Sequence, residues 1–82
     1  MVDVRFDILF ETKFKKIKDN STKEQIKKKI QKIIENPEIG KPMRYARKGT
    51  REVYIHPFRL SYIYNQAENK LSFLDIYHKD EQ

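Results

Sequence analysis

Three short segments near the C-terminus constrain the fold of this chain more than any other feature. They run from Glu52 to His56, from Phe58 to Tyr64 and from Lys70 to Tyr77, and they are rich in β-branched and aromatic residues. Pro57 separates the first two segments, and the polar stretch 65–69 separates the last two. Strands joined by such short turns pair antiparallel, so the sequence predicts a three-stranded meander. The rest of the chain must then cover one face of that sheet.

The N-terminal half supplies a strand and two helices for this purpose. Apolar and charged residues alternate over residues 2–6, which is the period of a half-buried strand. Phe10, Phe14 and Ile17 are spaced by four and three, so they share one face of a helix. The polar break 19–21 ends that helix.

A second helix follows the break. Ser21 and Glu24 have the spacing of a capping box, with Ser21 as the cap and Glu24 reaching back to it. Four isoleucines then form one apolar stripe: Ile26, Ile30, Ile33 and Ile34. The helix is predicted to end at Asn36, because the residue before a proline resists helical geometry. The short break between the helices predicts an antiparallel helical hairpin.

The predicted order is β-α-α-β-β-β in a single domain, residues 1–82. This is an α+β fold with an N-terminal strand and a helical hairpin packed on an antiparallel sheet. Residues 37–50 hold both glycines and two of the three prolines, and they are expected to form a loop.

Composition narrows the classes of function. The chain has 82 residues and no cysteine, which excludes disulfides and thiolate metal sites. Its two histidines lack the spacing of a zinc site, so no metal or cofactor is expected. The net charge of +6 favours a nucleic acid or an acidic protein as partner. No segment is apolar enough to span a membrane, and the N-terminus lacks the pattern of a signal peptide. We therefore expect a cytoplasmic protein.

Strand alternation assigns the side chains of the meander to two faces. Val53, Ile55 and Leu60 are expected under the helices. Glu52, Tyr54, His56 and Arg59 then share the opposite face. The last strand is harder to assign, because Leu71, Phe73, Leu74 and Ile76 occupy both alternation positions. Either a β-bulge or burial on both faces accounts for that pattern. His78 has the alternation of Leu74 and Ile76.

Three pieces of the sequence together resemble the RelE/ParE superfamily of bacterial and archaeal toxins. They are NPEIGKPM, GTREVYIHPFRLSYIY and LSFLDIYHK. Members typically carry a loop reading "GKPL", a strand reading "YRIIY" and a last strand ending in "HR" or "HK". The resemblance covers nearly the whole chain and rests on the order and spacing of these pieces.

The resemblance implies the toxin of a type II toxin–antitoxin system. RelE-like members cleave mRNA in the ribosomal A site without a metal, by attack of the 2′-hydroxyl on the adjacent phosphate. ParE-like members poison DNA gyrase instead. A cognate RelB-like antitoxin is implied as the protein partner, in a toxin–antitoxin hetero-oligomer.

The resemblance also assigns roles to individual residues. Arg59 matches the arginine of the "YR" strand and would stabilise charge on the phosphate, which its planar guanidinium suits. His78 matches the histidine at the strand end and would act as acid or base. Glu52 is a candidate base. The remaining candidates are RNA-binding residues: Arg47, Lys48, Arg51 and Lys79 for phosphates and Tyr54 for base stacking.

The sequence departs from the RNA-cleaving pattern at three places. RelE-like nucleases carry lysines near positions 52 and 54 and a tyrosine in the C-terminal tail, and this chain has neither. A different acid and base, a gyrase inhibitor, or a weak homologue that only binds its antitoxin would each account for this. Simpler interpretations remain for single residues: Arg59 as an ion pair with Glu52, His78 as a solvated strand end, and His56 as a turn residue.

Overall fold

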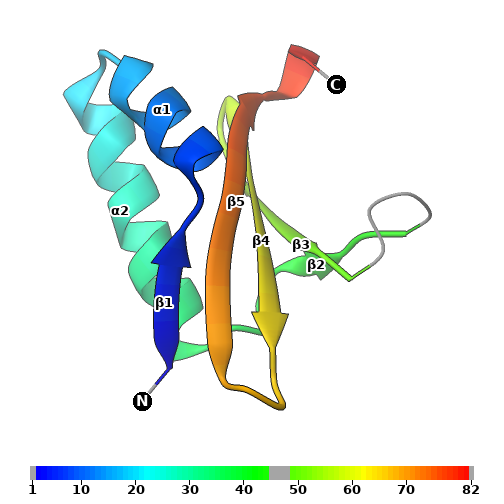
Figure 1. Cartoon of the computed structure of the whole chain (residues 1–82). Helices are drawn as coiled ribbons and strands as arrows, with labels where there is room; N and C mark the ends of the chain where they lie inside the picture. Colours follow the sequence, from blue (N-terminus) through cyan, green and yellow to red (C-terminus); the bar gives the residue numbers. More distant parts are fainter. Residues whose placement is uncertain (1, 45–48, 82) are drawn as a thin grey trace.

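A computed structural model describes residues 2–44 and 49–81 (Figure 1). Strand β1 (Asp3–Phe6) precedes the helices α1 (Ile8–Lys16) and α2 (Asn20–Glu35). The strands β2 (Lys41–Pro42), β3 (Arg51–Ile55), β4 (Phe58–Asn65) and β5 (Lys70–His78) follow, and a 3-10 turn (Lys79–Glu81) ends the chain. The predicted α+β order is confirmed. The addition is β2, which escapes prediction because it has only two residues and one is a proline.

The strands form one sheet in the order β1-β5-β4-β3-β2. β1 lies parallel to β5, and the other pairs are antiparallel, including the predicted meander. Both helices lie against the same side of this sheet (Figure 1). Neither helix, within the part of the chain that is described, is long and apolar enough to cross a membrane.

The core lies between the helices and the sheet. Phe10 of α1 and Ile26 and Ile33 of α2 are buried there. They meet six buried residues of the sheet: Ile55, Leu60, Tyr62, Leu71, Phe73 and Ile76. These helical residues belong to the stripes that the spacing of apolar residues predicts.

Helix α2 begins earlier than the capping box predicts. Its N-cap is Asp19, whose carboxylate accepts hydrogen bonds from Ser21 N (3.1 Å) and Thr22 Oγ1 (2.7 Å). These two bonds, the one from Thr22 first, lower the pKa of Asp19 below its usual value. The assignment of Ser21 as the cap is therefore wrong, because a carboxylate two residues earlier satisfies the free backbone N–H groups. The predicted end at Asn36 is confirmed.

A β-bulge in β5 resolves the mixed alternation of the last strand. The pairing of β4 with β5 shifts between Ser61 and Tyr62, which face Asp75 and Phe73 respectively. The shift allows Leu71 and Phe73, as well as Ile76, to point into the core. We call the helix-covered side of the sheet the inner face and the opposite side the outer face.

Tyr62, on the inner face, stabilises the turn that follows α2 by two hydrogen bonds. Tyr62 is fully buried, and its hydroxyl accepts a hydrogen bond from Gly40 N (2.8 Å) and donates one to Pro37 O (2.7 Å). A Cβ at Gly40 would lie 2.5 Å from that hydroxyl, so only glycine fits. Burial raises the pKa of Tyr62, while the Gly40 bond and the Arg51 charge act in the opposite direction.

Candidate functional site

A charged and aromatic cluster lies on the outer face of β3, β4 and β5. Its centre is Glu52, which is only 6% exposed. The Tyr77 hydroxyl donates a hydrogen bond to Glu52 Oε2. Arg59 Nη1 lies 3.7 Å from Glu52 Oε1, in an ion pair. The strand register brings these side chains together, because Arg59 is the cross-strand neighbour of Tyr77 on β5 and of Tyr54 on β3.

Arg59 links the buried carboxylate to the solvent. Its side chain is 40% exposed, whereas that of Glu52 is 5% exposed. The guanidinium Cζ lies 5.8 Å from the centre of the Tyr54 ring, within the range of a cation–π contact. The Arg59 guanidinium therefore contacts the Glu52 carboxylate on its buried side and the Tyr54 ring on another side. Its exposed N–H groups can still donate to a ligand.

Tyr54 connects the cluster to a histidine at the end of β3. The Tyr54 hydroxyl lies 2.7 Å from His56 Nδ1, and the two rings meet edge to face. Both side chains are exposed. When the His56 proton resides on Nε2, Nδ1 accepts from the tyrosine, which gives a continuous path for a proton.

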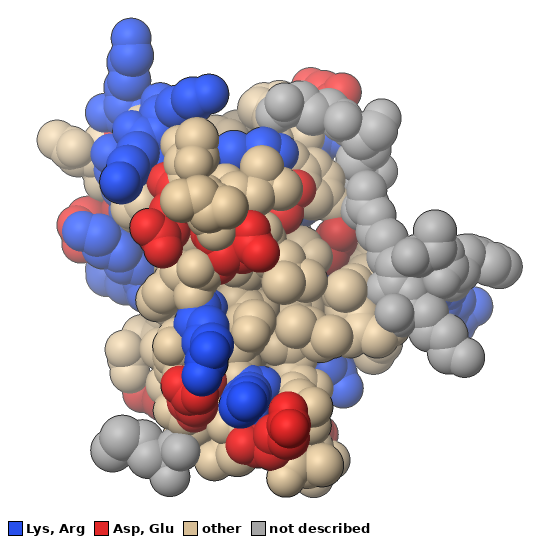
Figure 2. All heavy atoms as spheres, viewed as in Figure 1, with Lys and Arg blue, Asp and Glu red and all other residues tan. Residues whose placement is uncertain are grey.

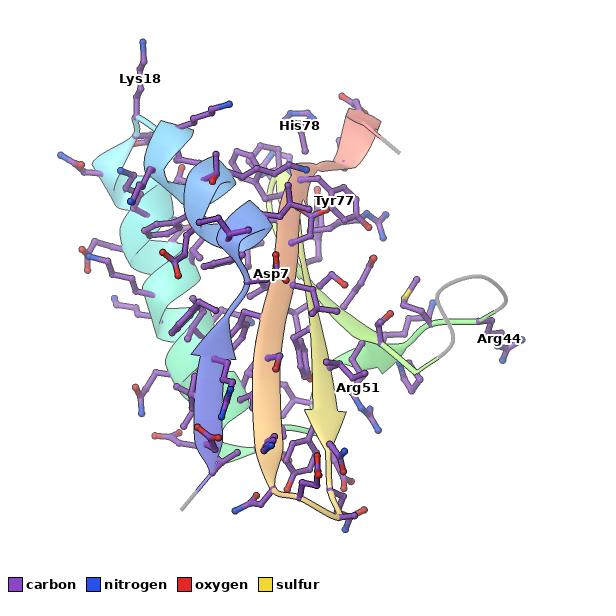
Figure 3. The ribbon with its side chains drawn as sticks, in the orientation of Figure 1. Asp7, Lys18, Arg44, Arg51, Tyr77 and His78 are labelled. Atoms are coloured by element: carbon purple, nitrogen blue, oxygen red, sulfur yellow. The ribbon has the colours of Figure 1, made fainter. Side chains whose placement is uncertain are left out.

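His78 does not join this cluster. Its cross-strand partner is Phe58, which faces the helices, and the two rings pack edge to face with centroids 5.8 Å apart. Its Nδ1 accepts a hydrogen bond from Asp80 N (3.2 Å). Figure 3 shows Tyr77 and His78 diverging from the end of β5. Because adjacent residues of a strand point to opposite faces, His78 points to the inner face, opposite the face that carries Tyr77 and Arg59.

The predicted RNA-binding residues fall in different places. Arg51 lies on the inner side, where Nη1 donates to Glu38 O (3.1 Å) and Gly40 O (2.8 Å), and Figure 3 places it far from Tyr77. Its place is therefore away from the outer-face cluster. Lys79 is exposed beyond the end of β5. Arg47 and Lys48 lie outside the described residues.

Sequence reasoning missed Tyr77 as a member of the site. Glu52 and Tyr77 are separated by 25 residues, and their contact depends on a register that includes the bulge. His56 carried a signal in its alternation with Glu52 and Tyr54, but its position before Pro57 favoured a turn residue. Chemically, the cluster offers a fixed cation for a phosphate and a hydroxyl–imidazole pair for proton transfer.

Comparison with known proteins identifies the class of this chain. A model of the family described as ParE toxin of the type II toxin–antitoxin system parDE matches residues 4–82. The chain belongs to this family of toxins. No curated protein sequence matches it.

Solved structures of RelE and YoeB/ParE toxins share the fold of this toxin. The E. coli RelBE toxin–antitoxin complex contains a chain that superposes with a TM-score of 0.80 at 19% identity, over 100% of both chains. The YoeB/ParE toxin from Agrobacterium tumefaciens gives a TM-score of 0.82 at 14% identity, over 94% of this chain and 98% of that chain. The archaeal RelE–RelB complex from Pyrococcus horikoshii gives 0.78 at 9% identity, over 99% and 98%.

Proposed function

We propose that this toxin is an mRNA endonuclease that cuts messages in the ribosomal A site. The observation that carries the proposal is the half-exposed guanidinium of Arg59, fixed between a buried carboxylate and the Tyr54 ring. A cation held in this way is ready for a phosphate without rearrangement, which is the form of electrostatic catalysis that contributes most to rate.

The proposed reaction needs only groups of the chain, groups of the RNA and a water molecule. The 2′-oxygen attacks the adjacent phosphorus, a new O2′–P bond forms, and the P–O5′ bond breaks. Arg59 binds the non-bridging oxygens, where negative charge builds. The 2′-hydroxyl passes its proton to the Tyr54 oxygen, whose own proton moves to His56 Nδ1 across 2.7 Å. The departing 5′-oxygen takes a proton from water.

Glu52 has a positioning role in this proposal rather than the role of base that the sequence suggests. Its carboxylate is 6% exposed and is engaged by Tyr77 and Arg59, so a 2′-hydroxyl does not reach it. A fixed negative charge behind Arg59 keeps the guanidinium aimed outward. His78 is not assigned a step, because it faces Phe58.

A cognate antitoxin is the proposed protein partner. Family membership and the net charge of +6 both support an acidic, RelB-like chain that wraps the toxin in the cytoplasm. The RelBE and RelE–RelB structures are complexes of this kind.

Gyrase inhibition is the second candidate. The matching family model is named for ParE, and His78, the histidine that the RelE-like resemblance assigns to catalysis, points to the face of the sheet opposite Arg59. An inhibitor of this type acts by binding a protein and needs no acid or base. A weak homologue that only binds its antitoxin would cause no growth arrest.

Expression of the toxin alone, followed by primer extension on cellular mRNA, separates these functions. We expect new 5′ ends within translated codons, and their loss in Arg59→Ala. Growth arrest with intact mRNA and a DNA-damage response would instead favour the gyrase target. The absence of any arrest would favour the weak homologue.

A further inference from the structure

We propose that a lysine-lined groove between α2 and β3 holds the backbone of an RNA strand that leads to Arg59. The inference deepens the proposed function and rests on it for the nature of the ligand. It assigns a role to lysines that would otherwise count as the solvated face of a helix.

The groove has a volume of about 320 Å³ and is built from two elements. Gln25, Lys28, Lys29 and Lys32 line it from α2, and Tyr54, Ile55 and His56 line it from β3. The spacing of the four α2 residues places them on one helical face. β2 pairs with β3 only at Arg51 and Glu52, so this part of the β3 edge is left to α2.

The charge of the groove has a single sign. Among the residues that the structure describes, its charged lining residues are all lysines, and no carboxylate lines it. Lys27, which lies outside the groove on the same helix, is paired with Glu24 at 3.5 Å. Within the described residues, no ion pair within 4.0 Å is found for Lys28, Lys29 or Lys32. Three cations held together without counter-charges repel one another, and a polyanion relieves that repulsion.

The groove and the proposed cutting site share two side chains. Tyr54 and His56 line the groove, and Tyr54 also contacts Arg59. Lysines beside exposed aromatic rings are the combination that single-stranded nucleic acid prefers, because phosphates take the charge and bases stack on the rings. An RNA strand that lies in this groove therefore passes Tyr54 and reaches Arg59.

The test measures binding and does not depend on cleavage. A fluorescein-labelled 12-nucleotide single-stranded RNA is titrated with the toxin at several potassium chloride concentrations. The variant Lys28→Gln/Lys29→Gln/Lys32→Gln is compared with Lys15→Gln/Lys16→Gln/Lys18→Gln, which removes the same charge from exposed sites outside the groove. Glutamine preserves helix propensity, so both variants are expected to fold.

We expect the groove variant to lower the salt slope of log K by about 2, at roughly 0.7 for each lost phosphate contact, and the control by much less. A second arm repeats the comparison with purified 70S ribosomes. A larger loss for the groove variant on free RNA supports the proposal, whereas a loss on ribosomes with free-RNA binding unchanged overturns it. An equal loss in both variants, or no loss on either probe, overturns the proposal, as does weakened antitoxin binding with RNA binding intact.

The two proposals fail in distinguishable ways. Normal RNA binding and mRNA cuts by the groove variant would refute the groove and leave the endonuclease standing. A groove-dependent salt slope without any cut message would refute the endonuclease and leave an RNA-binding surface.

Discussion

Two tyrosines on opposite faces of the sheet organise networks of different character. Tyr62 on the inner face bonds to the backbone groups Gly40 N and Pro37 O. Tyr77 on the outer face bonds to the carboxylate of Glu52, which in turn pairs with Arg59. Both hydroxyls join segments that are distant in sequence, but the Tyr62 hydroxyl bonds to neutral backbone groups, whereas the Tyr77 hydroxyl bonds to a carboxylate.

The difference indicates that the Tyr62 network serves the fold, and under the proposed function the Tyr77 network serves a ligand. Neutral partners that satisfy buried N–H and C=O groups fix a turn at little electrostatic cost. A buried carboxylate requires desolvation that hydrophobic packing would avoid, so its presence needs another reason. The half-exposed guanidinium that it holds supplies that reason.

Loss of Arg59 should give the largest effect, and it acts on cleavage. Arg59→Ala removes the cation that faces the phosphate, and we expect the cleavage rate to fall by about 10²–10³-fold. Arg59→Lys keeps the charge without the fork and should be intermediate. Rates are measured at a temperature at which circular dichroism shows each variant folded. Cleavage by a folded Arg59→Ala protein at the wild-type rate would contradict the role of the Tyr77 network in cleavage.

Loss of the Tyr62 hydroxyl should act on stability. Tyr62→Phe leaves the buried Gly40 N–H without its acceptor, and we expect a loss of about 2 kcal/mol in the free energy of unfolding in urea. Tyr64→Phe on the same strand is the matched control, because the Tyr64 hydroxyl bonds to Asn69 Oδ1 at an exposed site (3.0 Å). Equal stability losses in the two variants would contradict the structural role of Tyr62.

Loss of the Tyr77 hydroxyl should act on cleavage rather than on stability. Tyr77→Phe loosens the carboxylate behind Arg59, and we expect about a tenfold lower cleavage rate with little change in RNA affinity. Glu52→Gln should lower the cleavage rate by a similar factor. Because the two residues share one contact, the double variant should lose less rate than the product of the two single losses. Fully multiplicative losses would mean that the two residues act separately.

Alkaline pH should give the smallest effect, measured as the difference between wild type and Tyr62→Phe. Burial raises the pKa of Tyr62 above 10.0, so the folded chain keeps a proton that the unfolded chain loses first. The stability contributed by Tyr62 is therefore complete below pH 10 and declines as the pH rises further. Melting temperatures of wild type and Tyr62→Phe should converge above pH 10. A constant difference would refute the assignment.

Sequence periodicity predicted the element order because it depends only on local spacing. The sequence did not predict β2, because two residues are too few to show a period. It also did not predict Asp19 as the cap of α2, because Ser21 fits the capping-box spacing. The faces of Glu52, Tyr54 and Arg59 followed from alternation. Alternation also placed His78 with Ile76, on the inner face. The Glu52–Tyr77 contact needed the bulged register, which no local pattern encodes.

The most direct test adds purified toxin to a reconstituted translation system programmed with one defined mRNA. Wild type, Arg59→Ala and Tyr62→Phe are compared at a temperature at which all three are folded, and the 5′ ends of the message are mapped. We expect cuts within codons for wild type and Tyr62→Phe and none for Arg59→Ala. An intact message with folded wild-type toxin, or equal cutting by Arg59→Ala, would contradict the proposed role of Arg59 in mRNA cleavage.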